Sequence, residues 1–169
     1  MGLTIISLSH HCFRFIITIK TSNTRKNRRI VFHYHTSYIC CGIWWQFGGY
    51  TILYLEQNGE ILSYIIFIKA NNKIIRNCEE NDYYTIFLWT YPEHRGKGLA
   101  TLMSKAMLQD LKLNYNHFYK TISKDNIPSI RVAEKCGFRT ESDCVKTKFL
   151  HTIQKVDNGQ QYLYVYSAK

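Results

Sequence analysis

The stretch HRGKGLA, residues 94–100, has the residue types of an anion-binding turn. Gly96 and Gly98 let the backbone approach a ligand without a Cβ in the way, and Arg95 and Lys97 add two positive charges. A β-rich run precedes the glycines and a helical pattern follows them. The first N–H groups of a helix have no internal partner and lie at the positive end of its dipole. The turn therefore predicts a phosphate or pyrophosphate ligand.

Two familiar nucleotide motifs do not fit this stretch. A Walker A loop needs Gly-x-x-x-x-Gly-Lys-Ser/Thr, and a dinucleotide fingerprint needs a third glycine early in a parallel βαβ unit. Neither spacing occurs in residues 94–100. Taken alone, the two glycines also fit a helix that merely begins with glycine.

A second stretch of sequence favours the anion site over a helix that merely begins with glycine. The sequence TYPEHRGKGLATLM, followed about one strand later by SKDNIPSIRVAEKCGF, resembles the two halves of the GCN5-related N-acetyltransferase (GNAT) core. That family carries Arg/Gln-x-x-Gly-x-Gly/Ala after its fourth strand, matched here by Arg95, Gly98 and Ala100. It then carries an asparagine, a small residue three positions later and a Gly-Phe pair, matched here by Asn126, Ser129, Gly137 and Phe138.

The resemblance covers residues 50–169 and implies an acetyl-CoA site. The N–H groups of the turn would hold the pyrophosphate, the preceding strand end would lie along the pantetheine, and the asparagine would contact the cofactor arm. A backbone N–H at the strand end would also stabilise the oxyanion formed at the thioester. The implied cofactor-binding residues are Leu88, Trp89, Thr90, Arg95, Gly96, Lys97, Gly98, Leu99, Ala100, Thr101 and Asn126.

The resemblance also implies direct attack of a primary amine on the thioester, with both substrates bound together. The amine must lose a proton and the leaving thiolate must gain one, and the rest of the catalysis comes from positioning the two substrates. Ser129 is the candidate proton donor. Its alternative interpretation is an ordinary serine in the first turn of a helix.

The acid and base of some relatives have no counterpart in this chain. Those relatives place a tyrosine seven residues after the asparagine and a glutamate five residues before it, where this chain has Ala133 and Thr121. Glu79 and Glu80 are either a base that acts through water or solvated loop charges. We expect His94 to be an exposed turn residue. The sequence therefore assigns no acid or base from the pattern.

The sequence predicts a mixed α/β (α+β) protein, with a GNAT-like, mostly antiparallel central sheet and flanking helices. Asn58-Gly59 lies between two β-rich runs and predicts a hairpin over residues 50–69, because both central residues of a type I′ turn need positive φ. This hairpin and the elements named in the next sentence follow the order β-β-β-α-β-α-β-β from residue 50. The other elements are strands at residues 83–91 and 117–123, helices at 99–113 and 126–138, and a tail hairpin around Asn158-Gly159.

The helix after the glycines shows an apolar stripe at a spacing of three and four residues. One face is expected to carry Leu99, Leu102, Met103, Ala106 and Asp110, with Leu113 a turn further on.

The length of 169 residues fits one acetyltransferase-like domain, residues 1–169. Residues 50–169 form its acetyl-CoA-binding core. Residues 1–49 form an N-terminal part on the acceptor side, in which 12–20 and 29–35 read as strands. An apolar content of 46% with 20% charged residues excludes a disordered chain. The six cysteines show no metal-clamp spacing, so we expect no metal.

The net charge of +10 favours anionic partners. Residues 20–29 carry five of the 22 lysines and arginines, which keeps open a nucleic-acid-binding module with aromatic stacking, although no nucleic-acid motif is present. A catalytically inactive acyl-CoA sensor on the same fold is the other alternative, since the acid and base positions differ.

The acceptor is expected to be a small amine, either a nucleotide-linked amino sugar or a protein N-terminus. Trp44 and Trp45 either line its pocket or pack in the core. The basic balance argues against a polyamine, which would be repelled. No apolar run approaches the roughly 20 residues of a membrane span, so we expect a cytoplasmic protein, with a homodimer as the candidate assembly.

Overall fold

The computed structural model describes residues 14–17, 28–35, 50–72, 74–75, 77–110, 115–147 and 152–168, and before residue 51 it describes the backbone pairing alone. The basic stretch at residues 20–29 falls largely outside this part of the chain, and Trp44 and Trp45 lie wholly outside it. The elements are β1 (Arg14–Ile17), β2 (Arg28–His35), β3 (Tyr50–Gln57), β4 (Glu60–Lys69), β5 (Tyr83–Thr90), η2 (Pro92–His94), α1 (Leu99–Asp110), β6 (His117–Ser123), α2 (Ile127–Lys135), β7 (Arg139–Lys146), β8 (Ile153–Lys155) and β9 (Gln161–Ser167).

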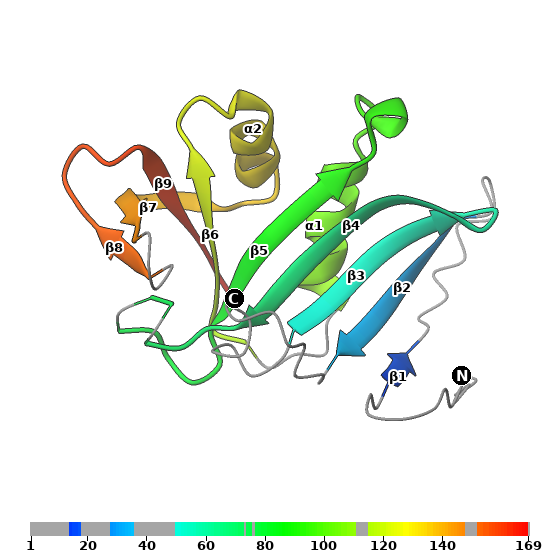
Figure 1. Cartoon of the computed structure of the whole chain (residues 1–169), viewed down its shortest axis with the longest axis horizontal. Coiled ribbons are helices and arrows are strands. Elements are labelled where there is room, and N and C mark those ends of the chain that lie inside the picture. Colours follow the sequence, from blue (N-terminus) through cyan, green and yellow to red (C-terminus); the bar gives the residue numbers. More distant parts are fainter. Residues whose placement is uncertain are drawn as a thin grey trace.

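Within the described residues, the strands form one nine-stranded sheet in the order β1-β2-β3-β4-β5-β6-β9-β7-β8 (Figure 1). The strand pairs are antiparallel except for β5 and β6. The predicted mixed, mostly antiparallel sheet is therefore confirmed, and so are the two N-terminal strands.

The predicted hairpin over residues 50–69 is confirmed as β3 and β4. Asn58 and Gly59 both have positive φ, at 54° and 85°, as a two-residue primed turn requires. Gln57 pairs with Glu60 across the turn. The hairpin places the start of β4 next to the end of β5, where Ser63 is opposite Thr90.

Strands β5 and β6 are paired at one end and diverge at the other (Figure 1). Their parallel register consists of Tyr83 with Phe118 and Tyr84 with Tyr119. Directly after this register, β5 has one extra residue relative to β4, Ile86, at a β-bulge. Because a bulge bends its strand and increases the local twist, the second half of β5 turns away from β6.

Both helices pack on the same side of the sheet and on each other. The core between them is built from alternate strand residues and from the inner faces of α1 and α2. Its fully buried members include Leu53, Ile65, Met103, Phe118 and Ala133. This core fixes where α1 begins relative to the end of β5.

The predicted face of α1 needs one correction. Leu99, Met103 and Ala106 are buried as expected, but Leu102 is 42% exposed and Met107 is fully buried. The helix is covered by the sheet on one side and by α2 on another, which rotates its buried face toward Met107. The side chain of Asp110 and the whole of Leu113 lie outside the described residues.

The predicted tail hairpin around Asn158-Gly159 is wrong. The turn joins β8 to β9, but β7 lies between these two strands and pairs with both. A Cβ on Gly159 would come within 2.5 Å of the Cys144 carbonyl oxygen. This glycine therefore permits a close approach to β7, not a two-residue hairpin. The order from residue 50 gains one strand, β-β-β-α-β-α-β-β-β.

Candidate active site

The turn between η2 and α1 has an open, glycine-shaped backbone. Gly96 and Gly98 have φ values of 72° and 73°, in the left-handed region that favours glycine. A Cβ at either position would meet nothing within 4 Å. Both residues are exposed, so a ligand can reach the backbone here directly.

The N–H groups of this turn are available to a ligand. The first helical hydrogen bond of α1 runs from the Leu102 N–H to the Gly98 carbonyl, at 3.0 Å. No residue in the described part of the chain accepts a hydrogen bond from the backbone N–H groups of residues 96–101. Free N–H groups at the positive end of a helix form an anion site, so the geometry matches the predicted phosphate cradle.

Two cations flank the turn without a carboxylate partner among the described residues. The Arg95 Nε donates to the Thr90 carbonyl at 3.1 Å, and its guanidinium lies 4.9 Å from the centre of the Trp89 ring. The Lys97 Nζ donates to the Glu93 carbonyl at 3.0 Å. Carbonyl acceptors leave a net positive charge in place, and both side chains are exposed. Their charge is available to an anionic ligand.

The end of β5 presents backbone groups toward the divergence. Tyr91 donates its N–H to Leu62 in β4, at 3.1 Å. Since backbone groups alternate sides along a strand, the groups of Trp89 also face β4, and the Trp89 carbonyl accepts from the buried Ser63 Oγ at 2.7 Å. The backbone N–H and carbonyl groups of Leu88 and Thr90 therefore point to the side from which β6 has diverged.

The outer face of β5, opposite the helices, carries stacked aromatic rings. Trp89 and Phe87 lie 6.2 Å apart between ring centres, and Phe87 and Tyr64 lie 6.1 Å apart. Phe87 is 45% exposed and Trp89 is 36% exposed. The Trp89 side chain thus lies on the outer, solvent-facing side of the sheet.

Asn126 and Ser129 meet at the start of α2. The Asn126 side chain caps the helix by accepting the Ser129 backbone N–H at 3.2 Å. Its amide nitrogen is therefore not needed for the cap. Asn126 is exposed and Ser129 is half-buried. Pro128 in the first turn and Gly137 with a φ of 87° bound this helix.

The positions of the missing acid and base are explained by local packing. Ala133 is fully buried on the inner face of α2. Thr121 lies on β6, where its Oγ1 is 2.8 Å from the Oη of Tyr84 on β5. This hydroxyl pair bridges the two strands next to their last parallel contact.

Glu79 and Glu80 lie before the beginning of β5. The glycine turn follows the other end of this eight-residue strand, and a strand rises about 3.3 Å per residue. The Glu79 carboxylate accepts from the Asn116 side-chain amide at 2.7 Å, and the Glu80 side chain is 90% exposed. Their geometry favours loop charges over a base near residues 88–90.

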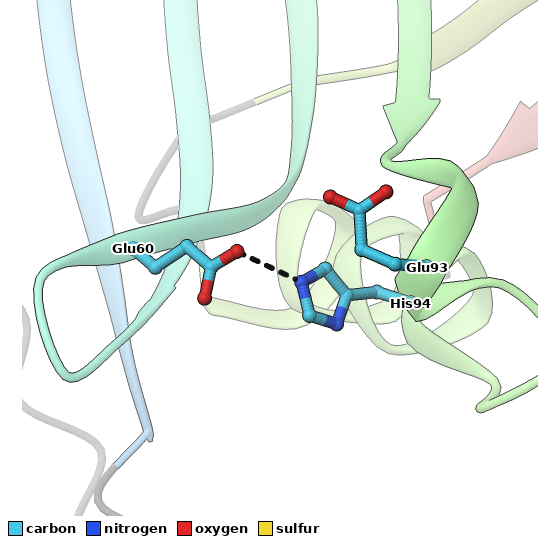
Figure 2. A group of neighbouring side chains, drawn as sticks. All are labelled: Glu60, Glu93 and His94. Atoms are coloured by element: carbon cyan, nitrogen blue, oxygen red, sulfur yellow. Dashed lines mark hydrogen bonds and ion pairs between the residues drawn. The ribbon is translucent and has the colours of Figure 1, made fainter.

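The expectation of an exposed His94 is wrong. Its side chain is 17% exposed, and its Nε2 lies 3.2 Å from Glu60 Oε1 at the start of β4. Figure 2 shows the Glu60 carboxylate pointing at the His94 ring, with Glu93 beside it on η2. The pair ties the turn that precedes residues 96–101 to the β3–β4 hairpin.

Two groups of side chains bring together atoms that metals use, within 4.8 Å of one another. One is Glu60, Glu93 and His94, and the other contains Asp82 and His117 with Glu79. In the second group the fully buried Asp82 accepts from the Glu79 N–H at 2.8 Å and lies 2.9 Å from His117 Nδ1. The carboxylates of Glu60, Glu79 and Asp82 take part in hydrogen bonds within the protein. Neither group includes a residue of the glycine turn.

Sequence reasoning missed Lys120. This lysine is 6% exposed, and burial lowers its pKa to about 8, against a smaller opposing effect of nearby Cys136. The signal was present, since Lys120 occupies the same alternate positions of β6 as the buried Phe118 and Ile122. The Glu60–His94 contact, in contrast, joins residues 34 apart and leaves no local pattern.

The comparisons with known proteins agree with this geometry. The model of the acetyltransferase (GNAT) family matches residues 17–138, which is well over half of the 169 residues. The chain therefore belongs to the GNAT acetyltransferase family. The match begins well before residue 50, so the expectation that the resemblance leaves out residues 1–49 needs correction. None of the curated proteins compared matches the sequence.

Solved structures show the same fold at low sequence identity. An N-acetyltransferase from Staphylococcus aureus Mu50 is 18% identical with a TM-score of 0.54, over 71% of this chain and 68% of that one. The microcin C7 self-immunity acetyltransferase MccE, in complex with acetyl-CoA and AMP, is 21% identical with a TM-score of 0.52, over 70% and 61%. A dodecameric spermidine N-acetyltransferase from Vibrio cholerae is 18% identical with a TM-score of 0.52, over 70% and 64%.

The family with its acetyltransferase class and the fold class, both predicted from the sequence, are confirmed. The chain spans between 61% and 68% of the length of the three structures described. Among the described residues, no helix is long and apolar enough to cross a membrane.

Proposed function

We propose that this protein transfers the acetyl group of acetyl-CoA to a primary amine by direct attack, with both substrates bound together. The observation that carries the proposal is the set of unpartnered N–H groups at residues 96–101, placed at the end of a strand that has diverged from its parallel neighbour. The family match supports acetyl-CoA as the ligand of this turn.

The site residues fit the cofactor by chemistry. The N–H groups of residues 96–101 would hold the pyrophosphate, and Arg95 and Lys97 would balance its charge. The backbone groups of Leu88 and Thr90 would lie along the pantetheine, because they face the divergence. Trp89 would contribute its ring instead, since its backbone faces β4.

Acetyl-CoA supplies an already activated acyl group when bound. The chain would then orient this group and the amine, which provides most of the rate enhancement. The Leu88 N–H would donate to the acetyl carbonyl oxygen as negative charge develops there. Asn126 would offer its free amide nitrogen to the cofactor arm, and Ser129 Oγ would give a proton to the leaving thiolate.

For the acceptor, we favour an amine that also carries negative charge, such as a nucleotide-linked amino sugar. The net charge of +10 attracts anions and repels polyamines. One structural neighbour holds AMP beside acetyl-CoA. A protein N-terminus is the second candidate acceptor, because the two motifs also resemble enzymes that acetylate N-termini.

The test is acetyl transfer to a panel of four amines, followed by coenzyme A release and by the mass of the product. The panel contains a nucleotide-linked amino sugar, the same amino sugar without its nucleotide, a peptide with a free N-terminus, and spermidine. We expect a 42-dalton mass gain on the nucleotide-linked sugar, at a rate above the other three. Faster transfer to spermidine would overturn the charge argument.

An acyl-CoA sensor remains the second candidate function, because Ala133 and Thr121 replace the acid and base of some relatives. A sensor would bind acetyl-CoA and acetylate no amine in the panel. Ser129→Ala separates the two functions further, since we expect slower transfer at unchanged acetyl-CoA affinity if Ser129 donates the proton.

A further inference from the structure

Lys120 is a buried cation without a counter-ion. It lies on the inner face of β6, between the buried residues Phe118 and Ile122, and is 6% exposed. In the part of the chain that the structure describes, no carboxylate or carbonyl accepts a hydrogen bond from its Nζ. The Nζ lies over the ring of Phe138, 3.7 Å from the ring centre. A buried charge without a paired anion is costly, so this lysine calls for a physical explanation.

The groups around Lys120 do not neutralise it. Cys136, after α2, has its thiol pKa raised by burial, so the thiol stays uncharged at neutral pH. Ser104 on α1 is fully buried, and its hydroxyl lies beside the Cys136 thiol, whose pKa it lowers by less than burial raises it. Lys105 on α1 is exposed and of the same sign as Lys120, and the buried Tyr164 of β9 lies opposite Lys120 in the register.

This polar cluster is linked to the first turn of α1 through Cys136. The Cys136 thiol donates to the Thr101 carbonyl at 3.7 Å, which joins the end of α2 to the turn. Phe138, whose ring lies under the Lys120 ammonium, follows Cys136 by two residues. The unpartnered N–H groups of residues 96–101 open the same turn on its solvent side. An anion bound there would lie near a charge that low-dielectric surroundings screen weakly.

We propose that Lys120 is a further cofactor-binding residue, whose ammonium supplies positive charge to the phosphates of acetyl-CoA from inside the core, so that binding draws a proton onto Nζ. The proposal rests on the proposed function, because it takes acetyl-CoA as the ligand of the turn. The proton comes from solvent, and no bond other than N–H forms. Without the anion, part of the Lys120 population is neutral near pH 8, because burial lowers its pKa to about 8.

The proposal fixes the direction in which acetyl-CoA affinity changes with pH. A ligand that favours the charged lysine binds more weakly as pH rises through the pKa of the free protein. With that pKa near 8, acetyl-CoA affinity should fall roughly tenfold between pH 7 and pH 9, and binding at pH 8 should take up roughly half a proton. The phosphates of the ligand are almost fully ionised from pH 7 upward, because the second pKa of a phosphate monoester is about 6.

The experiment is calorimetric titration of acetyl-CoA at pH 7, 8 and 9, in two buffers of different ionisation enthalpy, which counts the protons taken up. The proteins are wild type, Lys120→Met, Lys120→Arg and the exposed control Lys105→Met. For wild type and Lys105→Met we expect proton uptake and the tenfold fall. For Lys120→Met we expect weaker binding at pH 7, no uptake, and less than a twofold change with pH. For Lys120→Arg we expect tight binding that does not weaken at pH 9.

Other outcomes overturn the proposal. Proton uptake that persists in Lys120→Met would assign it to another group and reject the role of Lys120. Equal affinity of wild type and Lys120→Met at pH 7 would reject the charge contribution, while acetyl-CoA binding itself, and with it the proposed function, would stand. Failure of wild type to bind acetyl-CoA would reject both. Lys120→Arg provides the test if the methionine variant does not fold.

Discussion

At the residue scale, the buried Lys120 lowers the stability of the folded protein. Burial lowers its pKa from the ordinary 10.5 to about 8. In the unfolded chain the amine binds a proton that the folded chain holds less tightly, so this group costs stability below pH 8. That cost fades as pH rises from about 8 to 10.5.

Lys120→Met should therefore stabilise the free protein at neutral pH. A shift of this size corresponds to about 3 kcal/mol at pH 7, and the advantage of the variant should shrink toward zero as pH approaches 10.5. Denaturant unfolding of both proteins at pH 7, 8, 9 and 10 measures this difference. The comparison with the variant is needed because burial also raises the pKa of Tyr119 to about 12 and that of Cys144 to about 11, which acts with the opposite sign. An advantage that stays constant with pH would contradict the account.

Asn126 has two separable roles at the same scale. Its Oδ1 caps α2 at Ser129, and its amide nitrogen is proposed to contact the cofactor. Asn126→Asp keeps a capping oxygen but removes the amide nitrogen, whereas Asn126→Ala removes both. We expect Asn126→Ala to lose about 1 kcal/mol of stability and Asn126→Asp to lose little. Both variants should bind acetyl-CoA more weakly in titrations. Unchanged affinity in Asn126→Asp would leave Asn126 as a cap alone.

At the scale of elements, the glycine turn is held from two directions. Arg95 bonds to the Thr90 carbonyl at the end of β5, and His94 bonds to Glu60 on the neighbouring hairpin (Figure 2). These contacts fix η2, and so fix where residues 96–101 begin. Because a single partly exposed hydrogen bond is worth about 0.5–1.5 kcal/mol, the expected effect of its loss is modest.

Removal of the His94–Glu60 contact should loosen the cofactor turn without unfolding the protein. For His94→Ala and Glu60→Ala we expect acetyl-CoA affinity to fall between about twofold and tenfold, which follows from the energy of one such hydrogen bond. Glu93→Gln is the control, because the Glu93 carboxylate lies within 4.8 Å of both members of the pair but is not part of their hydrogen bond. Titration of all three variants measures the effect. Equal behaviour of Glu93→Gln and His94→Ala would show that the contact does not position the turn.

The elements that carry local signals were predictable from sequence. Asn58-Gly59 defines a hairpin, and Pro128 with Gly137 bounds α2, because these residues act through their own backbone angles. Asn158-Gly159 carries the same signal but serves a close approach to β7. Strand β7 lies between the two strands that this turn joins, and local sequence patterns do not indicate such a pairing.

Within the candidate site, too, only the features that depend on a short local motif were predictable from sequence. The glycine turn and Asn126 were found because each depends on a short motif. The bulge at Ile86 and the contact between Glu60 and His94 depend on register between β4 and its neighbours. No short motif encodes register, so these features came from the structure.

At the scale of the whole molecule, the candidate cofactor site depends on the position of one helix relative to one sheet. The bulge bends β5 away from β6, and the glycine turn then reverses the chain. Helix α1 packs beside α2, and its first N–H groups have no hydrogen-bond partner among the described residues. A net charge of +10 favours the approach of an anionic ligand to this site. The central claim is that this arrangement binds acetyl-CoA.

The most direct test is thermal unfolding of wild type, Gly98→Trp and Gly59→Trp, each with and without acetyl-CoA. Gly98 and Gly59 both have positive φ and open surroundings, so the two substitutions carry comparable backbone strain, and only the first lies in the turn. With ligand at about 100 times its dissociation constant, wild type and Gly59→Trp should each gain about 2.7 kcal/mol and melt at a higher temperature. Gly98→Trp should not respond. If wild type does not respond, or if Gly98→Trp responds equally, the glycine turn is not the acetyl-CoA site.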